Sequence, residues 1–241
     1  MASHRARFVA LTNLLARHNV EVDSALIVSG RVLVDGRVIS NPAARVRADS
    51  ALRILPDRRL RGELKLSAAL DRLAIPVIER LALDIGASAG GFTTTLLAHG
   101  ARRVYAVEAG VGQLVGRLRS DSRVVNLEGH NLGNLDTSAV PETVEVIAMD
   151  LSYLALAAAV PQLEVLKIDP HADLVALVKP TFELRRATLV SDTTEVDEAV
   201  TRAAAGIASS GWKIRGVCRA PKTGRKGATE LFIHAHRHAG R

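Results

Sequence analysis

The chain has 241 residues, enough for one large domain and a small one. Hydrophobic residues make up 48%, which excludes a largely disordered chain, and the net charge of +7 favours an anionic partner, nucleic acid first, over a merely solvated basic surface. The single cysteine, Cys218, excludes a disulfide framework and fits the reducing cytoplasm, while no apolar run approaches the roughly 20 residues of a membrane span.

The first 58 residues read as a small α+β module. Phe8, Leu11, Leu14 and Leu15 fall at helical spacing, and a second short helix is expected over residues 22–29. The segment "GRVLVDGRVI" places two valine-rich strands around an Asp-Gly turn, a strong hairpin signal, and "ALRIL" closes a small sheet. A unit of this size has little core of its own, so we expect it to dock a partner.

A charged connector, "PDRRLRGE", marks the expected boundary between domains at residues 1–58 and 59–241. From Leu81 onward, apolar strands alternate with helical stretches such as 93–100 and 195–210. The strands are continuous apolar runs, as in a sheet covered on both faces, which predicts a doubly wound, Rossmann-like α/β sheet. The last two strands are joined by the short loop "RAPKTGRKGA", which predicts an antiparallel final strand.

The segment "LDIGASAGGFT" ends the first strand of this sheet and opens a helix. Gly86, Gly90 and Gly91 allow a tight turn and a close approach to a ligand, although their spacing is not that of a pyrophosphate-binding loop. Glu108 ends the second strand, where an acid accepts both hydroxyls of a ribose. A nucleoside site without a pyrophosphate-binding loop suggests that the ligand is S-adenosylmethionine. The alternative is that the glycines only form a tight turn and that Glu108 is exposed to solvent.

Two further strands end in charged residues, Asp150 in "AMDLS" and Lys179 in "LVKP". Carboxyl ends of parallel strands meet at one crevice, so the two side chains are expected to face each other. A lysine at a strand end often reaches solvent with its charged tip. The neighbouring carboxylate favours a catalytic group instead.

Seven segments, taken in order, resemble one known family: "RGELKL", "LDIGASAGGFT", "VYAVEAGVGQL", "RVVNLEGHNL", "MDLSYLAL", "LVALVKPTFE" and "TELFIHAHR". They are similar to the TlyA (hemolysin A-like) family of FtsJ-type methyltransferases, and the N-terminal module resembles the small RNA-binding domain named after ribosomal small-subunit protein four. The resemblance implies an S-adenosylmethionine-dependent enzyme that methylates ribose 2′-hydroxyls of ribosomal RNA, free or in ribosomal subunits. No metal is expected. The word hemolysin in the family name suggests a membrane activity, but the sequence shows no membrane span, no lipidation motif and no strongly amphipathic basic helix, so no membrane partner is expected.

The same resemblance assigns residues to roles. Its catalytic tetrad of lysine, aspartate, lysine and glutamate falls on Lys65, Asp150, Lys179 and Glu230. Lys179 is expected to accept the hydroxyl proton, while the other three position it and the hydroxyl. The residues expected at the cofactor are Asp84, Gly86, Ala87, Ser88, Gly90, Gly91, Phe92, Glu108, His130, Asn131 and Asp150.

Several positions depart from the family pattern. The segment before the first lysine reads "LRGE", the second strand ends in Glu108 rather than aspartate, and the loop before Glu230 is unusually basic, with Lys222, Arg225 and Lys226. These changes leave two rival functions open. One is a small-molecule methyltransferase on the same fold, and the other is a non-catalytic RNA-binding or ribosome-assembly factor.

Overall fold

The structure, a computed structural model, describes residues 7–20, 26–27, 31–39, 41–55, 60–190, 192–221 and 227–237. The chain divides into two compact units, Met1–Arg58 and Arg59–Arg241, and each has a hydrophobic core of its own. Of the helix expected over residues 22–29, only residues 26 and 27 are described, and the basic loop with Lys222, Arg225 and Lys226 lies outside the described residues.

The first unit contains one described helix and five short strands. They are β1 (Phe8–Ala10), α1 (Leu11–Arg17), β2 (Val32–Val34), β3 (Arg37–Ile39), β4 (Arg45–Arg47) and β5 (Leu52–Ile54). β2 lies between β3 and β5 in an antiparallel sheet, and β1 pairs with β4. Asp35 and Gly36 both have positive φ, 48° and 77°, the conformation that a two-residue hairpin turn requires. The expected hairpin and its closing strand are confirmed.

Phe8 corrects the reading of the first helix. Leu11, Leu14 and Leu15 are buried on α1, but the helix begins only at Leu11. Phe8 lies in β1, directly opposite Arg47 of β4, and its side chain is 53% exposed. The helical spacing wrongly predicted that Phe8 belongs to the helix. Spacing between neighbouring residues cannot reveal that β1 pairs with β4, a strand far along the chain.

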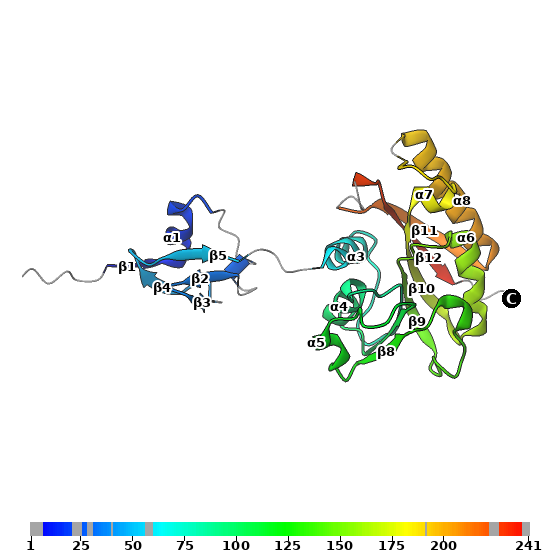
Figure 1. The fold of residues 1–241 in the computed structure, drawn as a ribbon, viewed down its shortest axis with the longest axis horizontal. Helices are drawn as coiled ribbons and strands as arrows, with labels where there is room; N and C mark the ends of the chain where they lie inside the picture. The colour runs from blue at the N-terminus through cyan, green and yellow to red at the C-terminus, as the bar shows by residue number, and fades with distance from the viewer. Residues whose placement is uncertain are drawn as a thin grey trace, which may run out of the picture. The chain divides into compact units, whose positions relative to one another are not determined.

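The second unit is built on one seven-stranded sheet (Figure 1). Its strands are β6 (Leu81–Ile85), β7 (Arg103–Glu108), β8 (Val124–Glu128), β9 (Val144–Met149), β10 (Ile168–Val178), β11 (Trp212–Arg219) and β12 (Leu231–Arg237). The order across the sheet is β11-β12-β10-β9-β6-β7-β8. Strands β6 to β10 are parallel, while β12 runs antiparallel to both of its neighbours. The Rossmann-like sheet with an antiparallel final strand is therefore confirmed.

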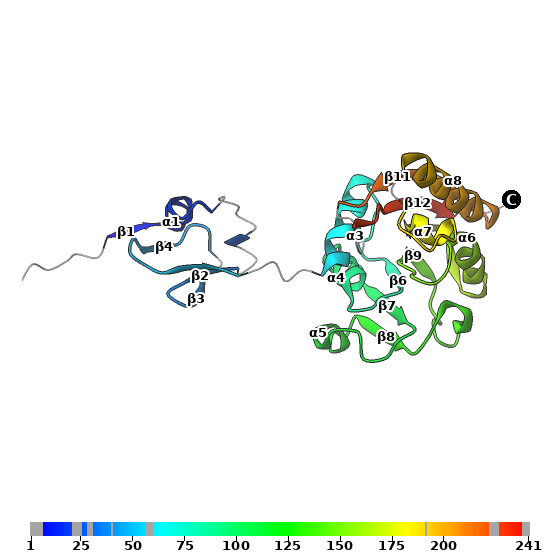
Figure 2. The ribbon, with the colours of Figure 1, turned by 45° about the horizontal axis from the view of Figure 1, so that its top comes forward.

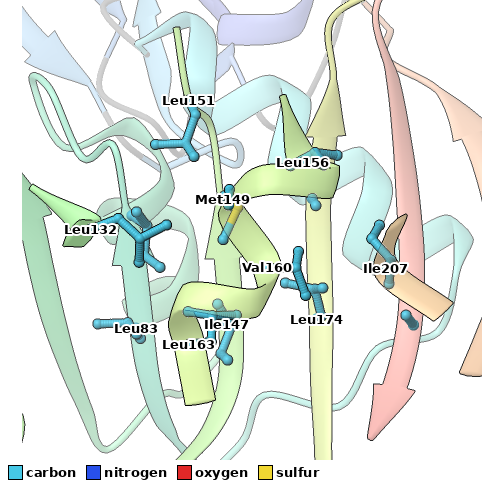
Figure 3. Close-up of a cluster of buried hydrophobic side chains, with 14 of the residues drawn as sticks. Leu83, Leu132, Ile147, Met149, Leu151, Leu156, Val160, Leu163, Leu174 and Ile207 are labelled. Atoms are coloured by element: carbon cyan, nitrogen blue, oxygen red, sulfur yellow. The ribbon is translucent and has the colours of Figure 1, made fainter. Parts of the chain in front are cut away.

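Helices cover both faces of this sheet, as the continuous apolar strands predict. One layer holds α3 (Arg61–Arg72), α4 (Gly91–Ala98) and α5 (Gly116–Arg119); the other holds α6 (Leu156–Ala159), α7 (Pro180–Glu183) and α8 (Thr193–Ser209), together with the 3₁₀ turn η2 (Val160–Val165) (Figure 2). A further 3₁₀ turn, η1 (Leu132–Asn134), follows β8. Figure 3 shows the second layer's core, where Leu156 and Ile207 face Ile147 and Leu174 of the sheet.

A charge cluster fastens the sheet at the edge where the parallel strands begin. Asp173 of β10 is 5% exposed and contacts His234 Nε2 at 2.7 Å, His236 Nδ1 at 3.2 Å and Arg80 Nη1 at 2.6 Å. Burial alone raises the pKa of Asp173, but the hydrogen bonds from His234, Arg80 and His236 outweigh it and lower the pKa to about 2. The carboxylate therefore stays charged and joins β10, β12 and the approach to β6.

The opposite edge carries the free ends of the parallel strands. β6 is central, and the direction of strand order reverses between β6 and its neighbour β9. Ligands of doubly wound folds bind outside the carboxyl ends of the strands at such a point. None of the helices in the described part of the chain combines the length and apolar composition that a membrane crossing requires.

Candidate active site

The loop that joins β6 to α4 depends on glycine for two reasons. Gly86 and Gly90 have φ of +87° and +94°, a region that other residues rarely adopt. A Cβ on Gly86 would also lie 2.3 Å from the carbonyl oxygen of Asp150. The loop therefore packs directly on the end of β9, which places Asp150 beside it.

Helix α3 is brought to the same place by a second close backbone contact. A Cβ on Gly91, the first residue of α4, would lie 2.9 Å from the Cα of Gly62. The two helix starts therefore touch through their glycines. Lys65 follows one turn later on α3, and its side chain is buried against the sheet.

The four expected catalytic residues form two ion pairs. Lys65 Nζ contacts Glu230 Oε2, and both side chains are less than 10% exposed. Lys179 Nζ lies 2.5 Å from Asp150 Oδ1 and donates a hydrogen bond to Ser152 Oγ at 2.8 Å. The Lys179 contact with Asp150 is close but not aligned as a hydrogen bond, so Asp150 Oδ1 has no directed donor among the described residues.

A single cavity of about 790 Å³ joins these pairs to the glycine loop. That volume falls in the usual range for small-molecule and cofactor sites. Lining residues that the sequence predicted are Lys65, Gly86, Ala87, Ser88, Gly91, Phe92, Glu108, His130, Asn131, Asp150, Lys179 and Glu230. All four predicted catalytic residues therefore reach the same space.

Asp84 and Gly90, both expected at the cofactor, do not line the cavity. Asp84 is fully buried, and its Oδ2 accepts a hydrogen bond from Thr93 Oγ1 at 2.6 Å. Gly90 is covered from the other side, since a Cβ there would lie 2.2 Å from Leu118 Cδ1. In this structure these two residues shape the loop from behind the cavity wall, and their contact with the cofactor stays a prediction.

Burial dominates the electrostatics of Asp84. Loss of water raises the pKa of Asp84 to about 7, and the charges of Asp150 and Glu108 add to the rise. Its Oδ1 has no hydrogen-bond partner in the described chain. A positively charged ligand beside the loop would stabilise the ionised form of this carboxyl.

Glu108 ends β7 at the cavity with its carboxylate already oriented. Glu108 Oε1 accepts from Gly110 N at 2.7 Å and from Gln113 Nε2 at 3.2 Å, while Oε2 accepts from Ser88 N at 2.9 Å. The side chain thus ties the glycine loop to the loop after β7. Because Oε2 has one donor among the residues that the structure describes, it can still accept a hydrogen bond from a hydroxyl of a bound ribose.

These observations fit a sulfonium nucleoside such as S-adenosylmethionine. The cavity offers a glycine loop, an acid placed for a ribose and the carboxylate of Asp150, while the buried carboxyl of Asp84 lies behind its wall; these negatively charged groups suit a ligand that carries a cation and a sugar. In the described part of the chain, no cluster of three or more histidine, cysteine, aspartate or glutamate side chains is arranged to hold a metal ion.

Sequence reasoning missed several lining residues. Arg61 and Gln113 reach the cavity from α3 and from the loop after β7. Ser152 and Tyr153 come from the loop after β9, and Phe182 comes from α7. Tyr153 is 56% exposed at the cavity, unusual for an aromatic ring. Its place three residues beyond Asp150, after a buried strand, was the available signal.

Comparisons with known proteins agree with this geometry. The FtsJ-like methyltransferase family matches residues 58–237. The 16S/23S rRNA (cytidine-2′-O)-methyltransferase TlyA of Mycobacterium tuberculosis is 38% identical over 217 residues, which cover 86% of this chain and 81% of that protein. Hemolysin A of Brachyspira hyodysenteriae is 30% identical over 217 residues, 87% of this chain and 90% of that protein.

Solved structures give the same answer for the fold. A candidate hemolysin from Streptococcus thermophilus superposes with a TM-score of 0.72 at 27% identity, covering 98% of this chain and 90% of that one. Fibrillarin from Aeropyrum pernix, at 19% identity and a TM-score of 0.55, covers 77% of this chain and 78% of its own and shows the shared fold. With these TlyA and hemolysin A relatives, the chain belongs to the FtsJ-like methyltransferase family.

Proposed function

We propose that the protein transfers the methyl group of S-adenosylmethionine to a ribose 2′-hydroxyl of ribosomal RNA. The observation that carries this proposal is the pair of lysine–carboxylate contacts, Lys65 with Glu230 and Lys179 with Asp150, in the wall of the cavity that also holds the glycine loop. The M. tuberculosis relative is named for cytidine 2′-O-methylation of 16S and 23S rRNA, which supports the same substrate here.

The residues that line the cavity have different roles in binding the cofactor and positioning the ribose. Glu108 and the glycine loop hold the nucleoside end of the cofactor, and the bound cofactor supplies an electrophilic methyl group on its sulfonium sulfur. Lys65, fixed by Glu230, is placed to donate hydrogen bonds to the incoming ribose. These contacts align the hydroxyl oxygen with the methyl carbon, and alignment alone accounts for a large share of such an acceleration.

Lys179 moves the proton. Once the ammonium of the Lys179–Asp150 ion pair has released a proton to water, the neutral amine of Lys179 accepts the proton that leaves the 2′-hydroxyl while the oxygen–carbon bond forms. Asp150, 2.5 Å away, stabilises the ammonium that results. Ser152 accepts a hydrogen bond from the same Nζ at 2.8 Å and fixes its direction. The proton is later released to water, so the site returns to its starting state.

We further propose that the first unit binds RNA. Residues 1–58 hold nine arginines against five acidic residues, an excess concentrated in less than a quarter of the chain. On the ribbon formed by β1 and β4, exposed Phe8 lies opposite Arg47, and Arg45 lies two residues away on the same strand face. An exposed aromatic ring between arginines suits a stacked base with its phosphates.

Labelled methyl transfer tests the proposed function. The protein is incubated with methyl-labelled S-adenosylmethionine and ribosomal subunits from cells that lack it, so that the target is unmodified. We expect label in RNA at ribose positions that resist alkaline cleavage, because a 2′-O-methyl group blocks that cleavage. Label on a base, or in small molecules only, would favour the rival enzymes, and absence of label from all RNA would refute the proposal.

A further inference from the structure

Helix α7 is a single helical turn. A lysine of the active site immediately precedes it, and a buried glutamate is its last residue. Lys179 precedes the helix, and its backbone carbonyl accepts hydrogen bonds from Phe182 N and Glu183 N at 2.9 and 3.2 Å. Glu183 closes the turn. Its side chain is 7% exposed and is not part of the cavity lining.

The carboxyl of Glu183 is used at the start of the next short helix. Glu183 Oε1 accepts a hydrogen bond from Leu156 N at 2.8 Å. Leu156 is the first residue of α6, where backbone N–H groups have no partner within the helix. No ion pair of Glu183 occurs among the described residues, and burial raises the pKa of its carboxyl. An acid buried without a cation lowers the stability of the fold, so its presence here points to a role for its position.

The residues at the two ends of helix α7 therefore contact the two ends of segment 150–156. Lys179 contacts Asp150 and Ser152 at the near end, and Glu183 holds Leu156 at the far end. Tyr153 lies between these two points and faces the cavity. The segment forms the wall between β9 and α6, so its position sets where Asp150 and the ring of Tyr153 stand.

The far end of the segment has a firm support. Gly206 of α8 lies so close to α6 that a Cβ there would be 2.3 Å from the Cβ of Ala157. Helix α6 is thus seated on α8, next to the residue that Glu183 binds. Because α6 is held in place by α8, Leu156 has a fixed position, and its hydrogen bond with Glu183 fixes this end of segment 150–156 relative to α7.

We infer that Glu183 is a positioning residue, which fixes segment 150–156 against Lys179 through the backbone of Leu156. The inference rests on the proposed function, since it concerns the alignment of the same site. It requires no contact between Glu183 and cofactor or RNA. A displacement of about 1 Å in an aligned site can cost on the order of 100-fold in rate.

Two substitutions and a matched control test this role. Glu183→Ala removes the acceptor, whereas Glu183→Gln keeps a carbonyl oxygen at the same place. Glu198→Ala serves as control, because Glu198 is an exposed acid of α8 that pairs with Arg202 on the same helix. We expect Glu183→Ala to lower kcat for RNA methylation by roughly 10- to 100-fold. The dissociation constant of S-adenosylmethionine should change less than about twofold, and Glu183→Gln should keep most of the kcat.

Hydrogen exchange of the segment 150–156 gives a readout that needs no RNA. Faster exchange in Glu183→Ala than in wild type, with recovery in Glu183→Gln, supports the positioning role. Unchanged exchange and kcat in the alanine variant, or a glutamine variant as slow as alanine, would overturn it. If the alanine variant fails to fold, Glu183→Met fills the space without a comparable acceptor. Wild-type protein that methylates no RNA would instead refute the proposed function and leave the exchange result standing.

Discussion

At the scale of single residues, the site depends on carboxylates that the fold places in three different electrostatic settings. Asp84 is fully buried beside Thr93, Asp150 is held by Lys179, and Glu108 is held by backbone and amide N–H groups. Each setting predicts a different response to substitution or pH. Two of them can be measured without knowing the substrate.

Asp84 should make the stability of the protein depend on pH. In the unfolded chain this carboxyl ionises near its ordinary value of 3.8, whereas burial raises the folded pKa to about 7. The folded state therefore holds the proton more tightly, so this contribution is complete below about pH 4 and is lost as pH rises through 7. We expect the unfolding free energy of wild type to fall more over this window than that of Asp84→Asn.

Thermal or denaturant unfolding between pH 4 and pH 8 checks this difference. Asp197→Asn, at an exposed position on α8, is the matched control and should follow the wild-type profile. Parallel profiles for wild type and Asp84→Asn would show that Asp84 is not held as a buried acid.

Glu108 should control affinity for the cofactor rather than the chemical step. Hydrogen bonds from ribose hydroxyls to a charged carboxylate contribute about 1.5–3 kcal/mol each. Glu108→Ala is therefore expected to weaken S-adenosylmethionine binding at least tenfold, with a smaller change in kcat at saturating cofactor. Isothermal titration measures the affinity, and Glu164→Ala, at an exposed position, should bind as wild type. Unaltered affinity in Glu108→Ala would place the ribose elsewhere.

At the scale of elements, the junction of α3 and α4 decides whether Lys65 reaches the site. The departure "LRGE" is explained there: Glu63 Oε1 accepts from Leu60 N at 3.1 Å and pairs with Arg117 Nη2 at 3.3 Å. Glu63 thus satisfies a free N–H at the start of α3 and links this helix to α5. The glycine contact between Gly62 and Gly91 brings the same helix close to the loop.

Gly91→Ala should disturb this junction. The new Cβ would lie 2.9 Å from Gly62 Cα and 3.0 Å from Glu63 N, both backbone atoms, so the helices must move apart. We expect a loss of about 1–3 kcal/mol in unfolding free energy, together with reduced methyl transfer, because Lys65 moves with α3. Gly116→Ala is the control, since its Cβ would meet nothing within 4 Å. Equal stability and activity in the two variants would contradict the described packing.

The ribbon of β1 and β4 should bind RNA mainly through Phe8 and Arg45. Phe8→Ala removes a stacking surface worth about 1–3 kcal/mol for each stacked base. We expect RNA affinity to fall at least fivefold in this variant, and Arg45→Ala to lower both the affinity and its dependence on salt concentration. Val38→Ala, which shortens another exposed apolar side chain of the same unit, should bind as wild type. Affinity that is insensitive to Phe8 and Arg45 would exclude this ribbon.

Local pattern predicted the elements better than it predicted their contacts. The continuous apolar strands and the Asp-Gly turn were readable because each depends on neighbouring residues. The pairing of Phe8 with Arg47, 39 positions later, was not, and neither was the contact of Glu183 with Leu156, 27 positions earlier. Asp84 was placed at the cofactor by its motif, yet its burial depends on Thr93 and on the strands around it.

At the scale of the whole molecule, one edge of the seven-stranded sheet stabilises the fold, and the opposite edge carries the residues proposed for the reaction. The edge where the parallel strands begin is fastened by Asp173, His234 and Arg80, and the opposite edge opens into the cavity. The tetrad was predicted from family resemblance rather than from spacing. Its members come from α3, from the ends of β9 and β10 and from the start of β12, and only the assembled sheet brings them together.

The most direct test of the central claim compares three proteins on unmodified ribosomal subunits: wild type, Lys179→Ala and Lys213→Ala. Lys213 is an exposed lysine of β11 and serves as the matched control. The RNA is digested to nucleosides, and 2′-O-methylribonucleosides are measured by mass spectrometry. We predict one such product with wild type and Lys213→Ala, and at least a 100-fold lower rate with Lys179→Ala, at unchanged affinity for S-adenosylmethionine. Near-normal formation of that nucleoside by Lys179→Ala, or none by wild type, would contradict the account.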